Sequence, residues 1–218
     1  MYPTFPMVIE FAGNPAAGKS TAIQNLAQQM KEQGVRCELI PSALSISPLS
    51  HFKTEWIFDA WIICQSINTL LETCWNSETD IVIFDRGLVD TLCWLECFKN
   101  RGMIDDETQK IVENFARIGT WFDRISLVAV MRVDFTTALY RKGQSGSVIN
   151  QQTFSELDIA YKSVLSRLES DKISARIIEL HTDRLSPMEV CNFILSQVPT
   201  YSVPVTKLFE QEMAISST

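Results

Sequence analysis

The residues most suited to chemistry form one glycine-containing segment near the start of the chain: Gly13, Asn14, Pro15, Ala16, Ala17, Gly18, Lys19, Ser20 and Thr21. Their spacing is G-x-x-x-x-G-K-S, between an apolar stretch that predicts a strand and a stretch with helical spacing. In this setting glycines let backbone amides turn inward on phosphate oxygens, and the helix N-terminus adds partial positive charge. Lys19 is expected to reach the β- and γ-phosphates, and Ser20 to bind Mg²⁺. The segment predicts binding of a nucleoside triphosphate, ATP, with magnesium.

A second pair of chemical groups follows the apolar stretch Ile81–Asp85. In proteins with this loop, an acidic residue at such a strand end helps to hold Mg²⁺, so Asp85 is expected to complete a metal site with Ser20. Arg86 stands where many hydrolytic ATPases place a glutamate. A guanidinium there suits binding of an acceptor or of the transferring phosphate. The alternative for Asp85 is a helix N-cap.

Arg141 and Lys142 precede a polar segment, 143–152, that contains two glycines and predicts a mobile loop. Phosphoryl transfer builds negative charge on phosphate oxygens. We therefore expect a lid of about residues 141–152 on which Arg141 stabilises that charge. Arg132 is a weaker candidate for the same role. The ordinary alternative is that these cations stabilise a helix C-terminus and face solvent.

An acceptor is expected between the glycine-containing segment and the predicted helix Phe52–Asn76, where polar residues interrupt an apolar pattern. Buried polar groups cost stability unless they have partners, so some of them are expected to face a cavity. The substrate candidates are Glu55, Trp61, Gln65 and Asp90, the last of which could instead orient Arg86. An equally weighted interpretation is that the aromatic residues are core and the polar residues are exposed.

The elements that must position these residues alternate along the chain. Apolar stretches that predict strands are Met7–Ala12, Arg36–Ile40, Ile81–Asp85, Ile125–Val133 and Arg176–His181. Helical spacing covers Lys19–Gln33, Phe52–Asn76, Leu88–Asn100, Asp106–Trp121, Phe135–Lys142, Phe154–Ser170 and Pro187–Gln197. This alternation predicts an α/β fold with a parallel sheet covered on both faces. We expect one domain over residues 1–198 and a C-terminal tail over 199–218.

Together these motifs resemble the thymidylate kinase and deoxynucleoside kinase group of P-loop kinases. In that group a D-R or E-R pair closes the strand that carries the acidic metal residue, and an arginine-bearing lid follows the next strand and helix. The resemblance covers about Met7 to Val198. It implies a P-loop kinase core with strand order 2-3-1-4-5, and a carboxylate that activates the acceptor hydroxyl. The nearest carboxylates are Glu38, Glu55 and Asp59, and Glu55 is the first choice. Without such a base, a phosphate acceptor is favoured, because its oxygens are already nucleophilic.

Composition limits the remaining classes. The net charge of −7 disfavours nucleic-acid binding, which relies on Lys and Arg. No apolar run reaches the ~18–20 residues of a membrane span, and residues 1–6 lack a signal-peptide pattern, so a cytoplasmic location is expected. Six cysteines without a C-x-x-C pair, with two histidines, make a zinc site unlikely. Aromatic-rich helices suggest a homodimer.

The sequence therefore predicts ATP- and Mg²⁺-dependent phosphoryl transfer to a nucleoside or a nucleoside monophosphate. Two alternatives stay open. One is a kinase for another small-molecule acceptor, because this fold hosts many substrates. The other is a nucleotide-dependent switch that hydrolyses its nucleotide and acts on a protein partner.

Overall fold

The computed structural model describes residues 5–73, 78–143 and 150–198. Most of the expected lid, residues 144–149, and the expected tail from residue 199 lie outside the described residues. Within the described segments, no helix has both the length and the apolar character that crossing a bilayer requires.

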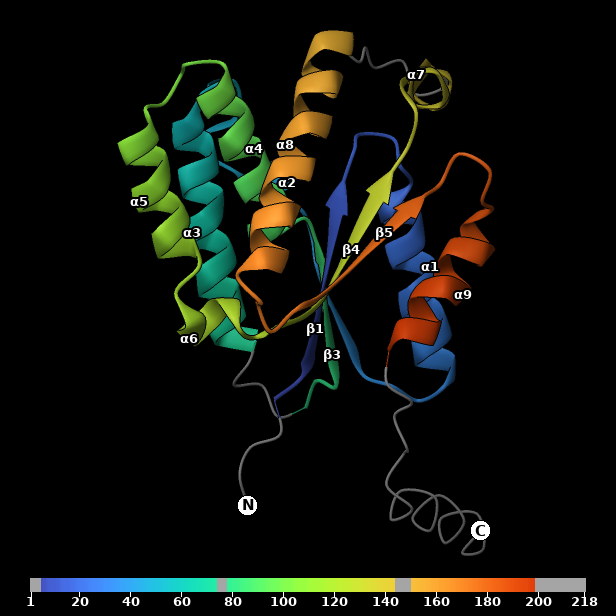
Figure 1. The fold of residues 1–218 in the computed structure, drawn as a ribbon. Helices are drawn as coiled ribbons and strands as arrows, with labels where there is room; N and C mark the ends of the chain where they lie inside the picture. The colour runs from blue at the N-terminus through green and yellow to red at the C-terminus, as the bar shows by residue number, and fades with distance from the viewer. Residues whose placement is uncertain (1–4, 74–77, 144–149, 199–218) are drawn as a thin grey trace, which may run out of the picture.

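A five-stranded parallel sheet forms the centre of the molecule (Figure 1). Its strands are β1 (Met7–Gly13), β2 (Cys37–Ile40), β3 (Ile81–Asp85), β4 (Ile125–Arg132) and β5 (Arg176–His181). The order β2-β3-β1-β4-β5 confirms the predicted sheet and its order. Because Phe11 pairs with Asp85 and Gly13 with Met131, the loop after β1 and the acidic end of β3 lie at the same edge.

Helices cover both faces of the sheet, as Figure 1 shows. One face carries α1 (Lys19–Glu32) and α9 (Pro187–Gln197), and the other carries α3 (Trp56–Thr73), α4 (Leu88–Asn100), α5 (Asp106–Ala116), α6 (Gly119–Phe122) and α8 (Gln151–Ser170). The short α2 (Ala43–Ile46) and α7 (Phe135–Gly143) lie towards the carboxyl ends of the strands. Each face has its own apolar core, because alternate strand residues point to opposite sides.

Several helix boundaries differ from the sequence prediction, and three of them differ by more than one residue. The expected helix from Phe52 begins only at Trp56, because residues Ser50–Phe52 form a 3₁₀ turn, η1. The expected helix to Trp121 ends at Ala116, whose carbonyl oxygen accepts a hydrogen bond from Trp121 Nε1 at 3.0 Å. α8 begins earlier than expected, inside the range assigned to the lid, because Asn150 caps it by accepting from the backbone N–H of Thr153.

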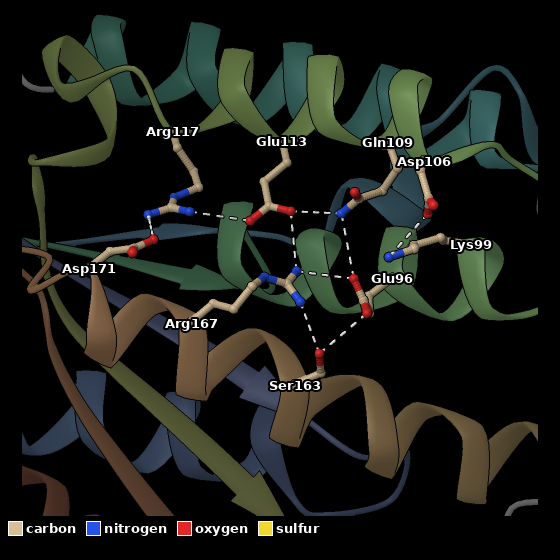
Figure 2. Close-up of polar contacts among 9 residues, drawn as sticks. All are labelled: Glu96, Lys99, Asp106, Gln109, Glu113, Arg117, Ser163, Arg167 and Asp171. Carbon is tan, nitrogen blue, oxygen red and sulfur yellow. Dashed lines mark hydrogen bonds and ion pairs between the residues drawn. The ribbon is translucent and has the colours of Figure 1, made fainter.

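A buried polar network joins α4, α5 and α8 (Figure 2). Arg167 of α8 lies between two carboxylates, with Nη2 at 3.0 Å from Glu96 Oε2 of α4 and 3.2 Å from Glu113 Oε2 of α5. Gln109 of α5 also donates to Glu113, at 2.7 Å. Glu96 and Glu113 are buried, so Arg167 supplies a positive charge that pairs with both of them in this interface.

Candidate active site

The loop after β1 has the conformation that a phosphate-binding loop needs. Gly13 and Gly18 both have positive φ, at 126° and 90°. At Gly13 a side chain is also excluded by space, because a Cβ there would lie 2.0 Å from the carbonyl oxygen of Met131. Lys19 crosses the loop, and its Nζ donates to the carbonyl oxygens of Gly13 and Asn14, each at 2.8 Å.

Burial lowers the pKa of Lys19 to about 7, and the nearby positive charge of Arg86 acts in the same direction. Phosphate oxygens in the cleft would oppose both effects, because an anion close to an ammonium group favours its charged form. Lys19 therefore fits a site whose natural occupant is anionic.

Ser20 and Asp85 meet across the mouth of the loop, where Ser20 Oγ donates to Asp85 Oδ2 at 2.9 Å. Among the described residues, no group of three or more His, Cys, Asp or Glu side chains could enclose a metal ion. A single hydroxyl with a single carboxylate still suits Mg²⁺, which keeps several waters and takes its other ligands from substrate phosphates. The donor set fits Mg²⁺ bound together with a nucleotide.

Asp90, on α4, is the hub of the site. Its Oδ1 accepts from the backbone N–H of Gly13 at 3.0 Å and from the hydroxyl of Tyr161 on α8, and its Oδ2 accepts from Arg86 Nη1 at 2.6 Å. The Gly13 N–H is also 2.7 Å from the Tyr161 oxygen. Asp90 therefore orients Arg86, one of the two roles considered from the sequence, and it also anchors the phosphate-binding loop.

Arg86 occupies the turn between β3 and α4 with a φ of 69°. Burial works against its charge, but Asp90 and Tyr161 more than offset this, so the pKa of Arg86 is raised above its ordinary value. Its guanidinium stays charged and fixed at the boundary of two cavities, both of which it lines.

Glu10 is a site residue that the sequence analysis missed. It points from the buried strand β1 to the start of α4, where its carboxylate accepts from the backbone N–H groups of Val89 and Asp90 at 3.2 and 2.8 Å. Burial raises the pKa of Glu10 to about 7, although the backbone hydrogen bonds partly counteract this. Gly87 provides the space, because a Cβ there would lie 2.8 Å from the Glu10 carboxyl group.

Three cavities lie in a row along this edge of the sheet. The middle one, of about 610 Å³, is lined by Pro15, Ala16, Gly18, Lys19, Ser20, Thr21, Ser42, Ser45, Asp85, Arg86, Arg141 and Lys142. A cavity of about 260 Å³ on one side shares Pro15, Ser42 and Arg86 with it. A third, also of about 260 Å³, shares Gly18, Thr21 and Arg141 and is lined as well by Ala17, Met131, Thr182 and Pro187. We name the first two after the roles proposed for them: the middle one is the phosphate cleft, and the one that shares Pro15, Ser42 and Arg86 with it is the acceptor cavity.

The predicted nucleotide-binding residues divide between these spaces. The phosphate cleft is lined by six of them, Pro15, Ala16, Gly18, Lys19, Ser20 and Thr21. Ala17 lines the third cavity. Gly13 and Asn14 line neither space, and their carbonyl oxygens accept hydrogen bonds from Lys19 Nζ. The structure therefore brings six of the nine residues of the motif together around one cleft.

Arg141 lies where α7 meets the phosphate cleft. Its guanidinium donates to the carbonyl oxygen of Ala16 at 3.2 Å and to that of Thr182 at 2.7 Å. It therefore bridges the phosphate-binding loop and the turn after β5. Arg132 is buried instead. Its Nη1 lies 3.1 Å from Asp158 Oδ1 and its Nε 3.1 Å from Glu179 Oε2, so its role is structural.

Three of the four substrate candidates do not line the acceptor cavity. Glu55 is exposed before the start of α3, and Trp61 and Gln65 of that helix are not among the residues that line the cavity. The face of α3 that lines the cavity carries Phe58, Asp59 and Ile62 instead. Of the candidates, Asp90 alone lines it, together with Arg86, Thr91, Trp94 and Phe98.

The sequence matches no family model and no curated protein. The structure is similar to solved structures of deoxyadenosine kinase from M. mycoides. With bound dATP, that protein superposes with a TM-score of 0.66 at 17% identity, and with bound dCTP with 0.64 at 17%; each match covers 88% of this chain and 98% of the other. The structure with the products dCMP and a flexible dCDP gives 0.66 at 15% identity over the same shares. The chain has the fold of a P-loop deoxynucleoside kinase.

Proposed function

We propose that this protein transfers the γ-phosphoryl group of ATP, with Mg²⁺, to a nucleoside or a nucleoside monophosphate. The observation that carries the proposal is the row of three cavities, in which Arg86 lines both the phosphate cleft and the acceptor cavity. A hydrolytic switch needs no acceptor cavity beside its nucleotide site, whereas a kinase must hold its acceptor in line with the phosphate.

The roles follow from position. Lys19 neutralises charge on the transferring phosphoryl group, and Ser20 with Asp85 holds the Mg²⁺ that links the phosphates to the protein. Arg86, fixed by Asp90, orients the acceptor oxygen towards the phosphate cleft. Arg141 stabilises charge from the opposite side, and a closing lid over 141–152 remains part of this proposal.

The structural relatives support the acceptor class. The M. mycoides proteins are deoxyadenosine kinases whose structures contain deoxynucleotides. An acceptor cavity of about 260 Å³ with largely apolar walls also suits a nucleoside better than an extended substrate such as a peptide.

The test is a thermal-shift screen of nucleosides and monophosphates in the presence of a non-hydrolysable ATP analogue, followed by kinase assays of the compounds that raise the melting temperature. We expect ADP formation to depend on the acceptor. Lys19→Met should lower kcat/KM by about 100-fold or more, as for loss of other groups that stabilise the transition state. If phosphate is released at the same rate with and without every acceptor, the protein is a hydrolytic switch.

A second variant separates the two substrates. Arg86→Ala should lower kcat/KM for the acceptor by much more than it lowers affinity for the ATP analogue, because Arg86 borders the acceptor cavity. Equal losses for both would contradict the role given to Arg86.

A further inference from the structure

The acceptor cavity contains a buried carboxyl group to which the sequence gave no firm role. Asp59 of α3 is 5% exposed and lines this cavity. Its Oδ2 is fully buried and has no hydrogen-bond partner among the described residues. A buried polar atom without a partner costs free energy, and native proteins keep such atoms rarely. A ligand in the cavity would supply the missing partner.

The other polar groups that line this cavity are largely engaged. Arg86 is bound to Asp90 at 2.6 Å, and both oxygens of Asp90 already accept hydrogen bonds. The Thr91 hydroxyl donates to the carbonyl oxygen of Gly87 at 2.6 Å. The walls beside Asp59 are apolar and aromatic, from Phe58, Ile62, Trp94 and Phe98. Apolar and aromatic walls beside a buried carboxyl group that lacks a partner suit an aromatic ring that carries hydrogen-bonding atoms on one edge.

Burial, together with the nearby charge of Asp90, raises the pKa of Asp59 well above its ordinary value. This shift favours the protonated form, in which the group presents an O–H donor beside a carbonyl acceptor. A base edge with an exocyclic amino group next to an unprotonated ring nitrogen is complementary to this pair. The amino group donates to the carbonyl oxygen, and the ring nitrogen accepts from the O–H.

Building on the proposed function, we propose that Asp59 determines acceptor specificity by binding the amino-substituted edge of the base, as in 6-aminopurine and 4-aminopyrimidine nucleosides. Such an edge keeps both hydrogen bonds even if the proton moves from the carboxyl group to the ring nitrogen. An edge with an N–H beside a carbonyl pairs only with the neutral acid and repels the carboxylate. An edge with two N–H donors leaves the carboxyl O–H without an acceptor.

The experiment compares kcat/KM for deoxyadenosine and deoxycytidine with that for the same two nucleosides lacking the amino group, and with thymidine and deoxyguanosine. The wild type should prefer at least one amino nucleoside over its matched analogue by about tenfold or more, because the analogue leaves the buried carbonyl oxygen of Asp59 without a donor. Asp59→Leu should bring this ratio close to one. Asp59→Asn should keep the preference, because an amide presents the same donor and acceptor. The control Glu55→Leu changes an exposed carboxylate just before the same helix and should leave the ratio unchanged.

An unchanged ratio in Asp59→Leu, or a wild type that prefers thymidine or deoxyguanosine, would overturn the inference while leaving the kinase intact. A failure of the proposed function looks different, because the wild type would then bind the ATP analogue and phosphorylate none of the nucleosides or monophosphates. Melting temperature separates specificity from structure. Removal of an unpartnered carboxyl group should not lower it, whereas a clear loss of stability in both Asp59 variants would assign Asp59 to the core instead.

Discussion

Arg86 combines a functional side chain with an unfavourable backbone. Its φ of 69° lies in the left-handed region, where a Cβ costs roughly 1 kcal/mol that glycine does not incur. The backbone N–H of Arg86 donates to Phe11 at 3.0 Å and its side chain is held by Asp90, so the surrounding contacts impose this conformation. Strain of this kind concentrates at functional sites.

A comparison of two variants isolates this strain. Arg86→Gly and Arg86→Ala both remove the guanidinium, but Gly relaxes the backbone and Ala does not. We expect Arg86→Gly to have the higher free energy of unfolding, by about 1 kcal/mol, in urea denaturation. Arg101, with a φ of −83°, is the matched control, and there the alanine variant should be the more stable one. If the alanine variant is the more stable one at position 86 as well, the backbone of Arg86 is not strained.

The residues that sequence could and could not predict differ in how local their contacts are. The glycine-lysine loop and Asp85 were predictable because each motif is contiguous and follows an apolar strand. The contacts of Asp90 were not, since its partners Gly13 and Tyr161 lie 77 and 71 positions away in the sequence. The periodicity of apolar residues does not indicate which residues that are distant in the sequence will be in contact.

The elements were predicted more fully than their orientation. The predicted bounds of β3, β5, α4 and α9 agree with the structure, because their apolar patterns are uninterrupted. Which residues of α3 line the cavity was not predictable, since Gln65 follows Phe58 and Ile62 at helical spacing but does not line it. Which face meets the cavity depends on how α3 packs against α4, and this is set by the tertiary structure.

The network between α4, α5 and α8 predicts an uneven response to loss of charge (Figure 2). Arg167→Met should lower the free energy of unfolding by about 2 kcal/mol, because Glu96 would stay buried without a cation and Glu113 would keep only Arg117, at 3.3 Å. This value is below that of a fully buried pair because the Arg167 side chain is 37% exposed. Lys162→Met on the same helix breaks an exposed pair with Asp158 and should cost less than about 0.5 kcal/mol. Equal effects in urea denaturation would contradict this account.

The anchoring of α4 by Glu10 predicts a pH dependence of stability. The pKa of Glu10 is raised from 4.5 to about 7 in the native state. Between these values the native protein keeps a proton that the unfolded chain has lost, so the free energy of unfolding falls as pH rises through this window. The contribution lost should be about 3 kcal/mol.

Glu10→Gln removes this titration. The difference in free energy of unfolding between wild type and Glu10→Gln should therefore decrease from about pH 5 to about pH 7 and then level off. Urea denaturation across this range measures it. A difference that does not change with pH, or that increases, would place the pKa of Glu10 near its ordinary value.

At the scale of the molecule, the three cavities form one continuous site across the carboxyl ends of the strands. Adjacent cavities share three residues each, so both substrates of the proposed reaction contact the same short stretch of chain. Open α/β sheets place their ligands at this edge.

A compound that joins adenosine to the acceptor nucleoside through a chain of phosphates should therefore bind all three cavities at once. We expect its Kd to be at least about tenfold lower than that of the ATP analogue, because the second part binds without a second loss of translational freedom. Thermal shift and calorimetric titration would measure this. A compound that binds no tighter than the ATP analogue would show that the acceptor cavity and the phosphate cleft cannot be filled together.

Asp90 sets a limit on how this site could be altered. One of its oxygens holds the guanidinium beside the acceptor, and the other holds the first turn of the loop around the phosphates. In the proposed reaction, the Michaelis constants for the two substrates should therefore change together. Any change that moves Asp90 should alter both in the same direction, so a new acceptor preference is more readily obtained on α3 than on α4.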